Sequence, residues 1–140
     1  MIRKKAWRYY CEYCKKRGGS GGHIKKHEKH CTLNPNRECG MCELRGESPY
    51  KMSDLLNCLP DPEPFKWIDE YGFCSYPGLN KSVEEAMPAL RRLVGECPAC
   101  IMAALRQKGI PVPVVESFNY KKECEIWLSG ANEENRECYY

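Results

Sequence analysis

The chain lacks any long hydrophobic run, and this absence excludes several classes of protein. Its mean hydropathy is −0.66. The basic start, MIRKKAWRYY, has no apolar stretch of the kind found in secretory signals, and no later segment could span a bilayer. We therefore expect a cytoplasmic protein without a membrane partner. A length of 140 residues predicts one domain, or one domain plus a small module.

Histidine is scarce, and its placement argues against an enzyme. All three histidines lie within residues 23–30, so none lies between Cys42 and Cys97, where some zinc-bound nucleases carry their catalytic histidine. A general base elsewhere would have to be a carboxylate. The carboxylates left by elimination are better explained as solvated charge: Asp54, Asp61, Glu63, Asp69 and Glu70. We expect no catalytic residues.

Cysteine, in contrast, is abundant. Eleven cysteines in 140 residues approach the level at which they act as a scaffold. A disulfide framework would leave one thiol over, and disulfides are rare in a reducing cytoplasm. We therefore expect the cysteines to bind zinc.

The first predicted zinc site lies near the start of the chain. Cys11, Cys14, His27 and Cys31 follow the spacing C-x2-C-x12-H-x3-C. This is the spacing of the common two-cysteine, two-histidine finger with its last histidine replaced by cysteine. His27 and Cys31 are four apart and share one face of a helix. His30 remains an alternative to Cys31 as the fourth ligand.

The predicted finger departs from the common pattern in its core. Gly18 stands where such fingers carry an aromatic residue, which predicts a looser, smaller core packed on Ile24. Ser20 is placed to cap a helix over residues 21–31.

The second predicted zinc site joins two distant C-x2-C pairs. Cys39 and Cys42 follow a turn, and Cys97 and Cys100 begin a short helix that Gly109 ends. A pair on a knuckle combined with a pair at a helix start is typical of treble-clef sites. We expect a second zinc ion here, bound by all four cysteines. The other cysteines lack ligand spacing, and we expect the first three to be buried and the last exposed: Cys58, Cys74, Cys124 and Cys138.

The predicted fold is a small, zinc-stabilised, helix-rich α+β structure. A finger over residues 1–33 precedes an irregular helical domain over residues 34–140, whose tail from about 130 to 140 we expect to be flexible. Ser82 is placed to begin a capping box, and Asn119 to cap the last helix. The aromatic segment FKWIDEYGF, residues 65–73, is expected to cover the core.

Charge is distributed unevenly along the chain. Residues 1–30 carry ten Lys and Arg against two Glu, a balance of +8, whereas the remainder carries twelve against seventeen, a balance of −5. This indicates a basic finger that meets polyanions and a body that does not. The protein partners and the oligomeric state are not fixed by these patterns.

Sequence-specific reading of DNA is not expected from this finger. Docked in a major groove, its helix would present Ser20, His23 and Lys26, a set without the Arg, Asn or Gln that read base edges with two hydrogen bonds. The remaining basic residues are expected to contact phosphates: Lys15, Lys16, Arg17, Lys25 and Lys29. Tyr9, Tyr10 and Tyr13 could stack on single strands. The alternative is a non-enzymatic protein adaptor or inhibitor in which zinc is purely structural.

Three segments carry a resemblance to a known group of proteins. NPNRECGMC, CPACIMAALRQ and FNYKKE resemble small zinc-finger proteins of tailed bacteriophages, which have no assigned function. The resemblance implies zinc binding and expression inside an infected bacterium, and we expect a regulatory or host-takeover role there.

Overall fold

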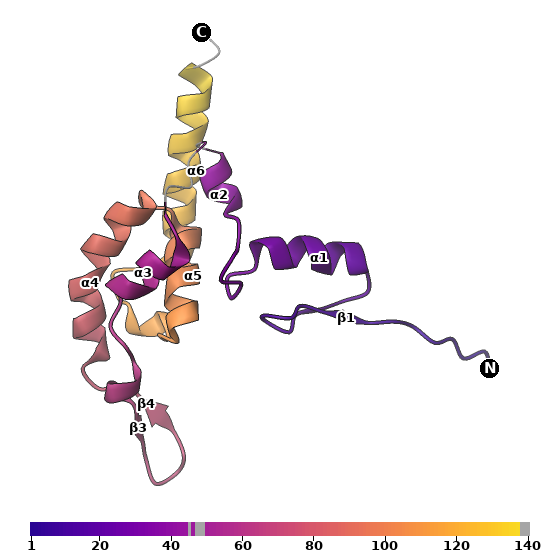
Figure 1. Cartoon of the computed structure of the whole chain (residues 1–140), viewed down its shortest axis with the longest axis horizontal. Helices are drawn as coiled ribbons and strands as arrows, with labels where there is room; N and C mark the ends of the chain where they lie inside the picture. The colour runs from indigo at the N-terminus through magenta and orange to yellow at the C-terminus, as the bar shows by residue number, and fades with distance from the viewer. Residues whose placement is uncertain (45, 47–49, 138–140) are drawn as a thin grey trace.

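The computed structural model describes residues 1–44, 46 and 50–137. A helical body carries two projections, which are the N-terminal finger and a small hairpin (Figure 1). The described helices and strands are, in chain order, β1 (Tyr9–Tyr10), β2 (Arg17–Gly18), α1 (Gly21–His30), α2 (Gly40–Glu43), α3 (Met52–Cys58), the 3-10 helix η1 (Glu63–Phe65), β3 (Trp67–Ile68), β4 (Cys74–Ser75), α4 (Leu79–Val94), α5 (Pro98–Lys108), the 3-10 helix η2 (Val112–Val114) and α6 (Tyr120–Glu137).

The finger is a short antiparallel hairpin packed against one helix. β1 pairs with β2 and α1 contacts both strands. The predicted cap is confirmed, because the Ser20 hydroxyl accepts a hydrogen bond from the backbone N–H of His23. A Cβ on Gly18 would lie 2.9 Å from Cδ1 of Ile24, so Ile24 occupies the space of the missing aromatic. The resulting core is small and consists mainly of Ile24 and two cysteines.

The body is organised around α5. This helix contacts α3, α4, α6 and η2, and most of its residues are buried. A helix that is apolar on nearly every face is stable only inside a core. Gly109 ends α5 in a left-handed conformation at φ 80°, as predicted.

The long helix α4 packs on α5 with a regular apolar stripe. Val83, Met87, Leu90 and Val94 are all buried. The predicted capping box at Ser82 is wrong, because α4 already begins at Leu79. Leu79 is fully buried, so core packing holds a first turn that has no side-chain cap.

The last helix, α6, begins as the sequence predicts. The Asn119 side chain accepts a hydrogen bond from Lys122 N–H, and Glu123 accepts one from Asn119 N–H, which is a reciprocal cap. The helix continues to Glu137 and so includes much of the predicted tail. Residues 138–140, with Cys138, lie outside the described residues. No helix in the described part of the chain is long and apolar enough to cross a membrane.

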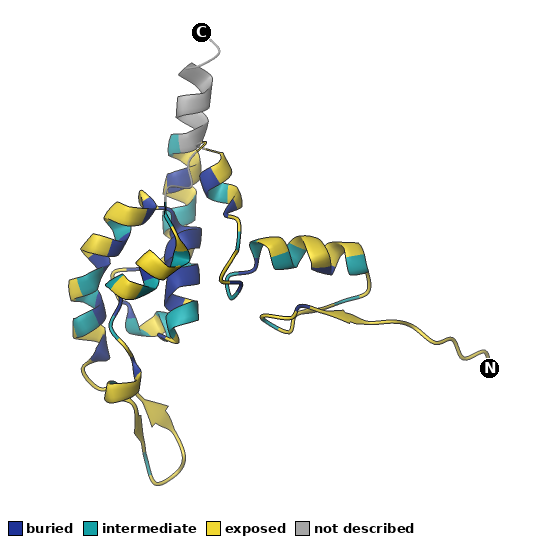
Figure 2. Cartoon of the chain, in the orientation of Figure 1, coloured by how far each residue is buried: buried dark blue, intermediate teal, exposed yellow. Residues whose placement is uncertain are grey.

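The prediction that residues 65–73 cover the core is wrong for most of this segment. Only Phe65 packs against the core cluster. The remaining large side chains lie on the β3–β4 hairpin, which projects from the body and is exposed along most of its length (Figure 2). Cys74 in this hairpin is likewise exposed, contrary to prediction, and Cys58 and Cys124 are only half-buried.

Residues 32–38 fasten the finger to the body. The Gln107 side-chain amide on α5 donates to the backbone carbonyls of Thr32 and Asn34, both at 2.9 Å. The Arg106 guanidinium donates to the Thr32 hydroxyl at 2.6 Å. Asn34 is buried, and its amide donates to the carbonyl of Glu28 in α1. The segment therefore holds both modules through hydrogen bonds and is not a free linker.

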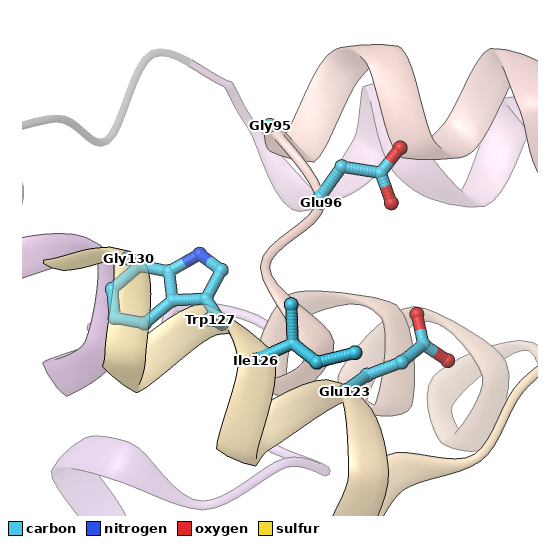
Figure 3. A pocket seen from close by; sticks show the side chains of 6 residues that line it. All are labelled: Gly95, Glu96, Glu123, Ile126, Trp127 and Gly130. Carbon is cyan, nitrogen blue, oxygen red and sulfur yellow. The ribbon is translucent and has the colours of Figure 1, made fainter.

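A cavity of about 430 Å³ lies between α6 and the turn that joins α4 to α5 (Figure 3). Ile126, Trp127 and two carboxylates, Glu96 and Glu123, line it. Arg91 forms ion pairs with both carboxylates. These charges therefore tie α4 to α6.

Candidate metal centres

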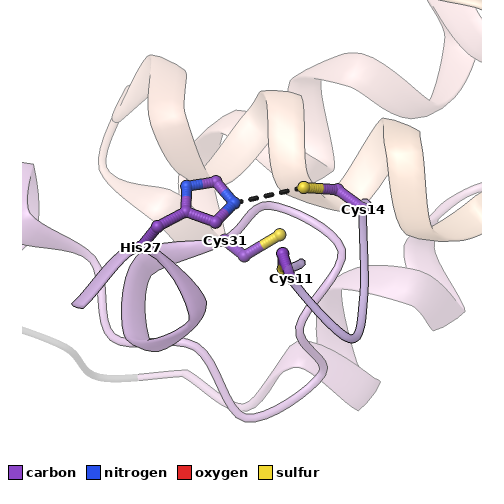
Figure 4. Close-up of side chains that lie close together, drawn as sticks. All are labelled: Cys11, Cys14, His27 and Cys31. Carbon is purple, nitrogen blue, oxygen red and sulfur yellow. Dashed lines mark hydrogen bonds between the residues drawn. The ribbon is translucent and has the colours of Figure 1, made fainter. Parts of the chain in front are cut away.

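The finger brings four potential ligands together. Cys11 follows β1, Cys14 lies in the turn between the strands, His27 lies on α1, and Cys31 caps the end of α1. Their side chains converge on one point (Figure 4), and their ligand atoms all lie within 4.8 Å of one another. Cys14 Sγ and His27 Nε2 are 3.1 Å apart. These are the four residues named by the C-x2-C-x12-H-x3-C spacing.

The alternative ligand, His30, lies outside this cluster. Its Nδ1 is 2.8 Å from the backbone carbonyl of Glu38, in the segment that joins finger to body. Cys31, four residues after His27, is buried beside Cys11. His30 therefore contacts the connecting segment, and Cys31 completes the group of four.

The body forms a second cluster from residues far apart in the sequence. Cys39 and Cys42 bracket the first turn of α2, and Cys97 and Cys100 bracket the first turn of α5. All four are buried, and their sulfur atoms lie within 4.8 Å of one another. Cys39 and Cys97 are 3.6 Å apart, as are Cys42 and Cys100.

These distances fit a tetrahedral metal ion and not a disulfide. Bonds of about 2.3 Å from a central zinc ion place tetrahedral sulfur ligands about 3.8 Å apart. A disulfide would require about 2.05 Å. The ten described cysteines are all free of disulfide bonds. Both clusters could hold a metal ion.

A bound cation would stabilise the ionised form of the four cysteines in the second cluster. Four sulfur atoms this close cannot all be ionised without positive charge among them. Hydrogen bonding with Cys100 lowers the pKa of Cys42 to about 7 and moves that of Cys39 lower still. Hydrogen bonding with Cys39 raises the pKa of Cys100, and hydrogen bonding with Cys100 raises the pKa of Cys97. A divalent cation would allow all four thiolates to form.

Two further residues surround the second cluster, and neither belongs to a ligand motif. The Tyr50 hydroxyl lies 3.1 Å from Cys42 Sγ and also contacts Cys100 Sγ. Burial raises the pKa of Tyr50, so the phenol keeps the proton that it can donate to a thiolate. Arg37 places a guanidinium nitrogen 3.9 Å from Cys100 Sγ. These donors offset the negative charge of a four-thiolate site.

The residues predicted to contact nucleic acid lie on the surface of the finger. All eight are exposed: Lys15, Lys16, Arg17, Ser20, His23, Lys25, Lys26 and Lys29. Two of the lysines already have partners in the finger and its connecting segment. Lys15 donates to the backbone carbonyl of Glu12, and Lys29 forms a salt bridge of 2.9 Å with Glu38.

The carboxylates considered for catalysis have mainly structural surroundings. Asp61 accepts a hydrogen bond from the backbone N–H of Glu63, and Asp69 accepts two in the β3–β4 turn. Asp54 lies in the first turn of α3, where a negative charge favours the helix.

The chain was compared with protein families, curated proteins and solved structures. No protein-family model, curated protein or solved structure matches the chain. The resemblance to phage zinc-finger proteins therefore stays a prediction.

Proposed function

We propose that the protein binds two structural zinc ions and that its basic finger contacts nucleic acid, mainly through phosphates. Zinc is supported by the donor sets, since three thiolates with one imidazole and four thiolates are both common tetrahedral zinc sites. The position of Cys97 and Cys100 at the start of α5 also supports the treble-clef type for the second site.

The observation that carries the nucleic-acid proposal is the surface of the finger. Its eight candidate residues are exposed, and residues 1–30 have a balance of +8. Lys15, Lys16 and Arg17 lie on the hairpin side, and Lys25 and Lys26 on the helix side. Cations distributed over both sides of a small module match a phosphate backbone better than a single small anion.

The contact is expected to be insensitive to sequence. Ser20, His23 and Lys26 of the predicted reading set are all exposed, but the Ser20 hydroxyl already accepts a hydrogen bond as the cap of α1. The first residues of the finger, up to β1, instead offer stacking surfaces, with Trp7 82% and Tyr10 56% exposed. Stacking on aromatic rings tolerates every base and favours single strands.

Fluorescence anisotropy of labelled single- and double-stranded DNA and RNA tests this proposal. The zinc-loaded full chain is titrated across a salt series, beside a variant with Lys15, Lys16 and Arg17 changed to serine. The control changes Lys121 and Lys122, which are exposed on α6, to serine. Each lost phosphate contact lowers the slope of log affinity against log salt by about 1.

We expect the finger variant to bind more weakly and with a slope reduced by about 2 to 3, and the control to bind like the original chain. Equal binding by all three proteins, or no binding near physiological salt, contradicts the proposal. Clearly tighter binding to one base sequence than to others would contradict the expectation that the contact is insensitive to sequence.

A protein adaptor is the second candidate, favoured by one observation. The β3–β4 hairpin carries exposed aromatic side chains that do not pack against the described core cluster. A regulatory role in an infected bacterial cytoplasm is part of the proposal and is supported by the resemblance alone. Reduced thiols in both centres also suit such a compartment.

A further inference from the structure

The β3–β4 hairpin has a well-defined shape. Trp67 pairs with Ser75, and Ile68 pairs with Cys74. At its tip the Asp69 carboxylate accepts hydrogen bonds from the backbone N–H groups of Tyr71 and Phe73, both at 2.9 Å. A loop fixed in this way loses little conformational entropy when it binds a partner.

This fixed loop presents large apolar side chains to solvent. Trp67 and Ile68 are each 57% exposed, and Tyr71 and Phe73 are 79% and 73% exposed. Aromatic residues are the commonest energetic anchors of protein interfaces. Single apolar side chains scattered over a surface are normal and need no explanation. A group of neighbouring exposed apolar side chains, as on this hairpin, indicates a binding surface.

The hairpin and its base are acidic. Residues 61–75 contain four carboxylates and one lysine. Glu70 is exposed at the tip. This charge disfavours nucleic acid and favours an apolar cleft bordered by cations.

The finger carries an open cleft bordered by cations, with Tyr13 as its aromatic lining residue. This cleft, of about 620 Å³, is also lined by Gly22 and Asn34, and its cations are Lys25, Lys26 and Lys29 of α1. Glu28 and Glu38 also line it, but Glu28 accepts a hydrogen bond from Glu12 N–H and Glu38 is paired with Lys29. A backbone N–H does not neutralise a carboxylate, so Glu28 keeps its charge, and the three lysines of the lining exceed its two carboxylates by one positive charge.

We propose that the β3–β4 hairpin of one copy docks into the finger cleft of a second copy. The hairpin and the finger project from the body in different directions (Figure 1), and Gln107 holds the connecting segment to α5. A chain therefore does not bring its own hairpin to its own finger. The contact does not require that the finger bind nucleic acid, although both would use Lys25 and Lys26.

The geometry implies a weak, concentration-dependent association. A single hairpin covers less surface than the roughly 800 Å² per partner of a standard stable interface. Hairpin and cleft are different surfaces, so the contact is head-to-tail unless two copies exchange hairpins reciprocally. Reciprocal exchange doubles the contact and closes the assembly as a dimer.

Sedimentation equilibrium of the zinc-loaded full chain, from micromolar to submillimolar concentration, tests the proposal. The double variant Trp67→Ser, Phe73→Ser removes two exposed anchors, and Tyr120→Ser removes an aromatic side chain that is 41% exposed on the body. We expect self-association of the original chain and of Tyr120→Ser, and its loss in the double variant. Zinc content and circular dichroism establish that each variant is folded.

A charge exchange makes the test specific for this pair of surfaces. Glu70→Lys and the double change Lys25→Glu, Lys26→Glu should each weaken association at low salt, and a mixture of the two proteins should recover it. A chain that stays monomeric throughout overturns the proposal. Association that survives loss of Trp67 and Phe73, or that the mixture fails to recover, overturns it equally.

Discussion

Replacement of Gln107 by alanine should loosen the finger from the body without disturbing either metal centre. The Gln107 amide donates to the carbonyls of Thr32 and Asn34, both at 2.9 Å, so the change removes two hydrogen bonds. Each contributes about 1 kcal/mol. Gln107 is half-buried, and water can replace part of this interaction, which leaves an expected loss of about 1 to 2 kcal/mol in local stability.

Amide hydrogen exchange measures this loss where it occurs. The backbone N–H of Asn34 donates to the carbonyl of Cys31 at the end of α1, that of Arg37 to the carbonyl of Asn34, and that of Glu38 to the carbonyl of Lys29. A loss of 1 to 2 kcal/mol corresponds to about 5- to 30-fold faster exchange of these amides. The N–H of Glu123, in the first turn of α6, serves as an internal control and should not change.

A second variant tests whether the loss of the two hydrogen bonds donated by Gln107, and not the loss of side-chain volume, accelerates exchange. Gln107→Glu keeps the size of the side chain but replaces the donor by a carboxylate facing two carbonyl oxygens. Its exchange should be at least as fast as that of the alanine variant. Unchanged exchange in both variants, or equal acceleration at Glu123, would refute the idea that Gln107 fastens the two modules.

Three further outcomes are expected. Tyr50→Phe removes a hydroxyl that contacts Cys42 and Cys100, and should weaken the second zinc site about 10- to 100-fold in a chelator competition. Glu38→Gln frees Lys29 from its salt bridge, and should tighten nucleic-acid binding at low salt in the anisotropy assay. Excess chelator should abolish the circular dichroism of the finger helix, because its core consists of one isoleucine and the ligands themselves.

The two clusters that could hold metal ions were the most predictable part of the protein. Ligand spacing is dictated by the metal, so C-x2-C pairs and the H-x3-C step identify their partners without knowledge of the fold. The sequence contains two C-x2-C pairs outside the finger, so the pair that begins at Cys39 could be matched with the pair that begins at Cys97. Local caps were predictable where one residue decides them, as the Asn119 side chain does at the start of α6 and the left-handed Gly109 does at the end of α5.

Features that depend on tertiary packing were not predictable. Ser82 looked like a helix start, but burial of Leu79 extends α4 by a turn. The aromatic residues of segment 65–73 were predicted to cover the core. The sequence pattern shows which residues share a face, but it does not show whether another part of the protein packs against that face. Tyr50, Arg37 and Gln107 gave no signal, since each acts through a partner distant in the sequence.

Native mass spectrometry of the full chain tests the central claim most directly. The account predicts two zinc ions per chain, and one in either Cys11→Ser or Cys97→Ser, each of which disables one cluster. Cys58→Ser, which changes a half-buried cysteine outside both clusters, should retain two. A chain that takes up fewer than two ions, or a Cys58 variant that loses one, would contradict the assignment of the two centres.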